Sequence, residues 1–161
     1  MTLRPFRHEC IILPFSELTV AFPMLETFET VAKAVADPSR VRILKLLEGG
    51  ELCVCQITTV LDLAPATISK HLAALKTAGL VQQRRDGKWV YYRLAERDFN
   101  AYARSFLDLV GASLKDDPTS VEDRRVLALV NAVPVQALCD QGRAALFSNA
   151  LAESTCCGGP P

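Results

Sequence analysis

The chain has 161 residues, of which half are hydrophobic, and its formal net charge is +0. This length and composition suit one main domain with a single core, because domains commonly contain about 100 to 200 residues. A balanced overall charge excludes a uniformly basic nucleic-acid-binding protein, so any contact with DNA must depend on local charge. Residues 62–93 provide such a region, with six basic residues and two acidic ones.

No secretion signal or membrane span is expected. An apolar patch at residues 10–13 is interrupted by Pro14, and no small-residue cleavage site follows it. The longest later apolar run, residues 126–135, contains polar Asn131 and is far shorter than the ~20 residues that cross a bilayer. We therefore expect a cytoplasmic protein with no membrane partner. Its six cysteines would be mostly reduced there, and a close pair favours a metal or redox site over a structural disulfide.

Apolar periodicity predicts four helices in the first half of the chain. The first begins near Met24 and has one apolar stripe. The second begins at Asp37, an N-cap residue followed by a proline, and ends at the glycine pair 49–50. The third runs from a Cys-X-Cys pair to about Asp62. After a short link, the fourth spans residues 64–75, so the third and fourth form a helix-turn-helix.

The helix at 64–75 has the composition of a DNA-recognition helix. Three apolar residues at i, i+4, i+7 spacing are expected to pack inward, namely Ile68, Leu72 and Leu75. Small hydrogen-bonding side chains can approach base edges in the major groove, while lysines can neutralise phosphates. The residues predicted to contact DNA from this helix are Thr67, Ser69, Lys70 and His71.

A basic hairpin is predicted after this helix. Strands at 81–85 and 88–94 flank Asp86-Gly87, a strong hairpin signal because both residues tolerate the positive φ of a type I′ turn. This register places Arg85 opposite Lys88 and Arg84 opposite Trp89. Like charges at the tip are understandable if Arg84, Arg85 and Lys88 contact a phosphate backbone.

The second half of the chain is predicted to be mainly helical. A long helix at 96–115 has aromatic and apolar residues at alternating 3 and 4 spacing, a seam suited to packing against another helix. Residues 119–152 predict one or two further helices broken near Pro134, with Leu129 and Val130 on one apolar stripe. The last residues, 153–161, have the composition of a flexible tail.

The order of Glu51-Leu52-Cys53-Val54-Cys55-Gln56, a helix-turn-helix and a basic hairpin resembles the ArsR/SmtB family of winged-helix repressors. Arsenite- and cadmium-sensing members of this family carry a Glu-Leu-Cys-Val-Cys-Asp motif at the corresponding place. The resemblance covers residues 24 to about 115. It implies a homodimeric repressor that binds double-stranded operator DNA and is released by a thiol-binding metal or metalloid. A dimer that reads two half-sites predicts an operator that is an imperfect inverted repeat.

The expected fold class is mainly α with a small β-hairpin (α+β), a winged helix-turn-helix with an extra C-terminal helical segment. Residues 1–23 form an N-terminal extension, whose order the sequence leaves open. The DNA-binding and dimerisation domain occupies residues 24–115. A C-terminal helical extension follows at 116–152, and a cysteine-containing tail at 153–161.

Cys53 and Cys55 are the predicted centre of the effector site, since a helix N-terminus favours thiolate, the form that binds metal. The resemblance implies three thiolate ligands for As(III) or Sb(III). Thr58 stands where the nearest family pattern has its third cysteine, and Gln56 replaces the usual aspartate. A third thiol must therefore come from elsewhere. We favour the tail residues Cys156 or Cys157 over Cys10 of the N-terminal arm and over Cys139, which is expected to be a core residue.

Two alternatives on the same scaffold stay open. A cadmium- or lead-sensing repressor would combine the thiol pair with Cys10 and bind Cd(II) or Pb(II). A thiol redox switch would use the cysteines without a metal. A thiol carrier of the metallochaperone kind is less favoured. No enzyme motif is found in the sequence, so we expect the protein to have no catalytic activity and no organic cofactor. The zinc site of the family is discounted because residues 98–114 contain no histidine.

The resemblance also implies a dimer interface made by the first helix and the helix after the hairpin. The corresponding residues are Phe28, Val31, Phe99, Tyr102, Phe106 and Leu109. Residues two apart on a helix are rotated by about 200°. We therefore expect the sulfurs of Cys53 and Cys55 to face one ion only if the start of their helix is unwound or displaced, which would couple ligand binding to the DNA-binding unit.

Overall fold

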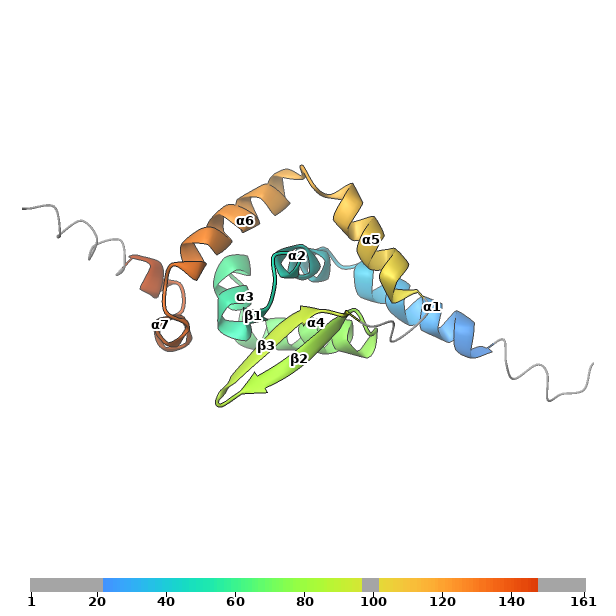
Figure 1. The fold of residues 1–161 in the computed structure, drawn as a ribbon, viewed down its shortest axis with the longest axis horizontal. Helices are drawn as coiled ribbons and strands as arrows, with labels where there is room; N and C mark the ends of the chain where they lie inside the picture. Colours follow the sequence, from blue (N-terminus) through green and yellow to red (C-terminus); the bar gives the residue numbers. More distant parts are fainter. Residues whose placement is uncertain (1–21, 97–101, 148–161) are drawn as a thin grey trace, which may run out of the picture.

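A computed structural model of the protein describes residues 22–96 and 102–147. Within these ranges the elements follow in the order α1, α2, β1, α3, α4, β2, β3, α5, α6, α7 (Figure 1). The fold is mainly helical with a small antiparallel sheet, as predicted. Among the described residues, no helix is both long and apolar enough to cross a bilayer. The predicted ligands Cys10, Cys156 and Cys157 and the interface residue Phe99 lie outside the described residues.

The four helices expected in the first half are present. They are α1 (Phe22–Val35), α2 (Pro38–Leu47), α3 (Val54–Leu61) and α4 (Pro65–Thr77). Asp37 caps α2 as predicted, because its side chain accepts a hydrogen bond from the Arg40 backbone N–H at 2.9 Å. The inward stripe of α4 is confirmed, since Ile68, Leu72 and Leu75 are completely buried.

The sheet contains a strand that the sequence did not predict. Its strands are β1 (Leu52–Cys53), β2 (Val81–Asp86) and β3 (Trp89–Leu94), in the order β1-β3-β2. Strand β1 pairs with β3 so that Cys53 lies opposite Tyr91. The first thiol of the Cys-X-Cys pair is therefore joined directly to the hairpin.

The predicted hairpin turn lies one residue too early, so the predicted strand pairing is wrong by two residues. Asp86 pairs with Trp89, so Gly87 and Lys88 form the turn, and Arg84 and Arg85 lie opposite Tyr91 and Val90. Gly87 has a φ of +58°, and neither Asp86 nor Lys88 has a positive φ. A two-residue turn with glycine at its first central position needs positive φ only there, so Asp86 remains extended and extends the strand.

The helix after the hairpin is shorter than predicted. Residues 95–96 are not helical, and α5 spans Ala103–Ser113. The two helices after it are α6 (Pro118–Asn131) and α7 (Val135–Gln141), with the expected break at Pro134. Asp117 caps α6 by accepting a hydrogen bond from the Ser120 backbone N–H at 2.9 Å.

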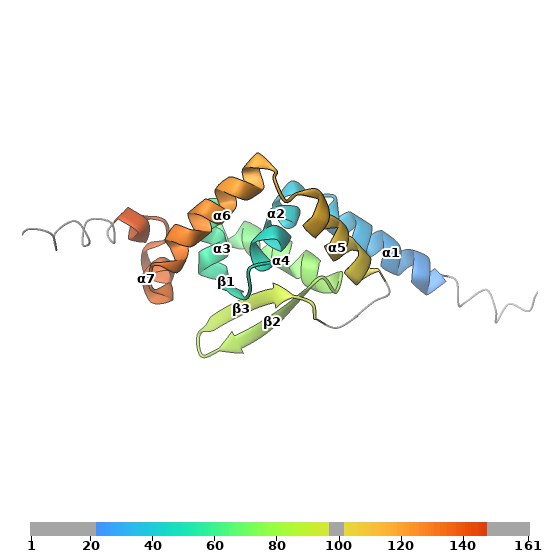
Figure 2. The same ribbon diagram turned by 45° about the horizontal axis from the view of Figure 1, so that its top comes forward.

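The C-terminal helices share the core of the helix-turn-helix. Helix α6 packs against α2 and α3, and α7 packs against α3. In both ribbon views, α6 and the β2–β3 hairpin lie on opposite sides of α3 (Figures 1 and 2). Val130, Val133 and Leu138 are buried in this core, whereas Leu129, predicted on the same apolar stripe, is 59% exposed. The extension is thus positioned to contribute side chains to the start of α3.

Candidate functional site

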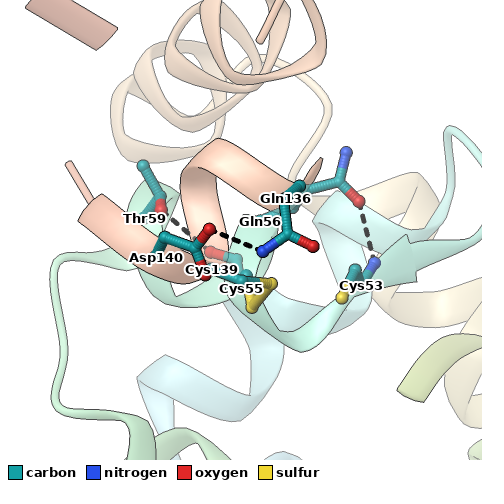
Figure 3. The surroundings of a disulfide bond; sticks show 7 residues. All are labelled: Cys53, Cys55, Gln56, Thr59, Gln136, Cys139 and Asp140. Carbon is teal, nitrogen blue, oxygen red and sulfur yellow. Dashed lines mark hydrogen bonds between the residues drawn. A yellow bond between two sulfur atoms is a disulfide. The ribbon is translucent and has the colours of Figure 1, made fainter. Parts of the chain in front are cut away.

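Three cysteine sulfurs come together where β1, α3 and α7 meet. Cys53 ends β1, Cys55 lies in the first turn of α3, and Cys139 lies on α7. Their sulfur atoms all lie within 4.8 Å of one another, and Figure 3 shows Cys55 and Cys139 in direct contact. Three soft thiol ligands at this separation are suited to a thiophilic metal or metalloid ion.

Two of the three sulfurs are bonded to each other. Cys55 and Cys139 form a disulfide between residues 84 apart in sequence, with their Cα atoms 5.2 Å apart. Cys53 is free, and only 1% of its surface is exposed. Because metal ligation requires thiolates, this pair must be reduced before all three sulfurs can bind an ion. Cys139, expected to be a core residue, is instead half-buried beside Cys55.

The expected unwinding of α3 is not required by this geometry. Cys53 is the N-cap residue, with extended backbone angles of φ −72° and ψ 150°, and the helix begins at Val54. The rotation of about 200° applies to two residues within one helix, and Cys53 lies before it. The sulfurs of Cys53 and Cys55 therefore lie close together while α3 remains intact.

Gln56 connects the thiol pair to the C-terminal extension. Its side-chain oxygen accepts a hydrogen bond from the Cys53 backbone N–H at 2.8 Å, and its amide nitrogen donates to the Asn131 side-chain oxygen at 2.9 Å. Gln56 is 9% exposed. On the next turn of α3, the Thr59 hydroxyl donates to the Cys55 carbonyl oxygen at 2.8 Å.

The thiol cluster opens into a cavity of about 410 Å³ that it shares with the hairpin. Besides the three cysteines, this cavity is lined by hairpin residues 88–90 and by Gln136 and Asp140 of α7. The indole nitrogen of Trp89 is buried and has no hydrogen-bond partner. A larger cavity of about 940 Å³ lies between α1, the end of α4 and β2, but no cysteine lines it. The smaller cavity is therefore the candidate site for a ligand that binds thiols.

The predicted DNA-contacting residues of α4 have different surroundings. Ser69 and Lys70 are exposed, and Thr67 is half-buried. The Ser69 hydroxyl donates to the Pro65 carbonyl oxygen at 2.9 Å. His71 is largely buried, with its Nδ1 3.7 Å from a carboxylate oxygen of Asp37. Asp37 is the N-cap residue of α2, so this contact links α4 to the start of α2. A role for His71 in positioning these two helices is consistent with this contact.

The charged side chains of the hairpin all lie on its exposed surface. Arg84 contacts Glu51 at 2.7 Å and Asp86 at 3.0 Å, and its guanidinium lies 5.0 Å from the centre of the Tyr91 ring. The hydrogen bonds that Arg84 donates to Glu51 and Asp86 raise the pKa of Arg84 above its usual value. The same bond to Glu51 lowers the pKa of that carboxyl group. Lys88 lies over Trp89, 5.5 Å from the ring centre.

The face expected to form a dimer interface needs one correction. Phe28 is 43% exposed and packs against Tyr102 and Phe106, with ring centres 5.3 Å and 5.8 Å away. Leu109 is 60% exposed and so is available to a partner, whereas Val31 is completely buried in its own protomer. Met24 and Leu25 of α1 are also exposed, although the sequence did not single them out for the interface.

The helix-turn-helix of α3 and α4, followed by the β2–β3 wing, defines a winged helix-turn-helix regulator. Residues 37–83 match the family model described as "Bacterial regulatory protein, arsR family". The chain is also similar to the homodimeric winged helix-turn-helix domain of Mb0332 from Mycobacterium bovis, a possible ArsR-family regulator, with 34% identity and a TM-score of 0.50. That likeness covers 62% of this chain and 85% of the other. The chain belongs to the arsR family.

Two curated relatives differ in the effector that their names imply. The arsenic resistance transcriptional regulator ArsR1 of Pseudomonas putida is 51% identical over 40% of this chain and 51% of its own length. The CadC homolog of Staphylococcus aureus, a cadmium resistance regulatory protein, is 45% identical over 40% of this chain and 54% of its own length. The match thus spans about half the length of these relatives.

Proposed function

We propose that the protein is a metalloid-responsive transcriptional repressor in the cytoplasm. A dimer binds operator DNA and is released when As(III) or Sb(III) binds Cys53, Cys55 and a third thiolate. The observation that carries this proposal is the set of three sulfurs within 4.8 Å of one another on the DNA-binding unit. The name of the Pseudomonas putida relative supports arsenic as the effector.

The third thiolate is best assigned to Cys139. Trivalent arsenic forms three bonds to sulfur in a pyramidal arrangement, so it needs three thiolates on one side of the ion. Cys53 and Cys55 come from one short segment, and Cys139 is the third cysteine near them among the described residues. Cys156 and Cys157 remain the alternative predicted from the sequence.

Binding at these thiols would act on the wing. Cys53 pairs with Tyr91 of β3, and the thiol cavity is lined by Lys88, Trp89 and Val90. An ion that rearranges the sulfurs therefore shifts the strand and side chains that hold the wing. An effector can weaken DNA binding only by its differential affinity for the two states, and ~3 kcal/mol corresponds to a change on the order of 100-fold.

Removing the thiols should separate DNA binding from the response. We expect Cys53→Ser and Cys55→Ser to bind operator DNA like the wild-type protein but to lose release by arsenite, because the sulfurs face the cavity and not the exposed surface of α4. Fluorescence anisotropy of a labelled operator, measured in a reducing buffer, tests this. Normal arsenite release by the double variant would refute the proposal.

A redox-switch function is the second candidate, and the Cys55–Cys139 disulfide favours it. Hydrogen peroxide would take two electrons and two protons from the two thiols, giving the disulfide and two molecules of water. Metal-free protein treated with peroxide would then change its operator affinity, and Cys139→Ser would not. The metalloid sensor instead responds to arsenite under anaerobic, reducing conditions, so the two functions are distinguished by which treatment releases DNA.

A further inference from the structure

We propose that the side chains of Gln56 and Asn131 form a clamp that holds α7, and with it Cys139, at the thiol pair of α3. The clamp makes Gln56 a positioning residue of the effector site and makes the C-terminal extension the source of the third ligand. This inference rests on the proposed function and specifies how its site is assembled.

The chemistry of the Gln56 amide suits a clamp. Its oxygen accepts from the Cys53 backbone N–H, and its nitrogen donates to Asn131, at 2.8 Å and 2.9 Å. A primary amide can accept and donate at once, whereas an ionised carboxylate can only accept. Gln56 is 9% exposed and its hydrogen bond to the Cys53 backbone is buried, so losing that partner would leave a buried polar group unsatisfied, which is costly. Asn131 is exposed and holds the other end of the amide. The Cys53 backbone is thereby tied to the end of α6.

The end of α6 determines where α7 begins. Asn131 is the last residue of α6, and α7 starts at Val135 after a short link. Pro134 stiffens this link because its ring fixes φ. Val133 and Leu138 on either side of it are 6% and 2% exposed. Fixing Asn131 therefore fixes α7, whose Cys139 has its Cα 5.2 Å from that of Cys55.

A separate contact holds the earlier part of α6. Arg42 of α2 donates two hydrogen bonds to Asp123, both 2.7 Å long, and this contact raises the pKa of Arg42. Asp123 is 5% exposed. Helix α6 is thus attached to α2 through Asp123 and to the thiol segment through Asn131. Loss of the Asn131 contact should leave the Arg42 contact in place, so the helix stays docked while its end is released.

Substitution of Asn131 tests the clamp in the full-length, reduced protein. Asn131→Leu removes the acceptor for Gln56, while Asn131→Asp keeps an acceptor and serves as the conservative rescue. Glu122→Ala, on an exposed part of the same helix, is the matched control. Circular dichroism reports whether each variant is folded, and Asn131→Ala replaces Asn131→Leu if that variant fails to fold.

The readout is the set of thiols that arsenite protects from iodoacetamide, identified residue by residue by mass spectrometry. In the wild-type protein, in Asn131→Asp and in Glu122→Ala we expect protection of Cys53, Cys55 and Cys139. In Asn131→Leu we expect protection of Cys139 to be lost and arsenite affinity to fall by about 10- to 100-fold, the usual effect of removing an outer-shell partner. X-ray absorption should then show fewer than three sulfur ligands on arsenic.

The possible failures are distinguishable. Full protection of Cys139 and unchanged affinity in Asn131→Leu would overturn the clamp and leave the repressor function intact. Protection of Cys156 or Cys157 instead of Cys139 in the wild-type protein would also overturn it, because the third ligand would come from the tail. Absence of protection at Cys53 and Cys55 in the wild-type protein would overturn the proposed function itself.

Discussion

At the residue scale, the charges of the wing are already partly engaged. Arg84 was predicted as a phosphate contact, but it is bonded to Glu51 and Asp86. The sequence could not indicate the Glu51 contact, because it depends on β1 and β2 being brought together by β3. A phosphate would have to compete with two carboxylates for this guanidinium. Lys88 lies over the Trp89 ring and has no acidic partner among the described residues, so its charge is more readily available.

This difference can be measured from salt dependence. Lys88→Ala should weaken binding to all DNA sequences alike and reduce the slope of log K against log salt by roughly 0.9 for one lost phosphate contact. Arg84→Ala should act in the same direction, and Glu51→Gln should strengthen binding because it removes a competitor for Arg84. An unchanged slope for Lys88→Ala and for Arg84→Ala would contradict phosphate contact by these two wing residues.

Ser69→Ala should instead change the preference between operator and random DNA.

At the element scale, local signals predicted the helices but not their neighbours. Asp37-Pro38 starts α2 as predicted, since capping depends on adjacent residues. Asp117-Pro118 starts α6 by the same kind of cap, which the sequence analysis did not single out. Strand β1 has two residues and is defined only by pairing with β3, so no periodicity announces it. Cys139 was predicted to be a core residue because the sequence likewise does not show which distant residues lie beside it. Its helix was predicted, but its position beside Cys55 follows from tertiary packing.

The source of the third thiol is therefore best tested by removing one element at a time. We expect Cys139→Ser to weaken the arsenite response more than truncation after Ser154 or deletion of residues 1–23, because Cys139 lies within the sulfur cluster. Operator release is titrated with arsenite and, in parallel, with cadmium. A larger effect of truncation would restore the tail cysteines as ligands. A larger effect of the deletion, together with a strong cadmium response, would indicate a cadmium or lead sensor that uses Cys10.

At the scale of the whole molecule, helices α1 and α5 carry exposed apolar side chains. Leu25 is 67% exposed and Leu109 is 60% exposed, and Phe28 adds an aromatic surface. Contiguous exposed apolar residues commonly mark a protein interface. We therefore expect this face to join two protomers, which would present two α4 helices to half-sites about one helical turn apart.

Charge placed on this face should abolish dimerisation and operator binding together. Leu109→Lys should give a monomer by analytical ultracentrifugation, because a lysine at a buried apolar contact is left without a partner. A monomer binds only one half-site, whereas in a dimer the binding of one unit holds the second unit close to its own half-site. Operator affinity should therefore fall by on the order of 100-fold or more. Leu129→Lys is the matched control, since Leu129 is similarly exposed, at 59%, but lies in the last turn of α6. A monomeric Leu109→Lys that keeps full operator affinity would contradict recognition by a dimer.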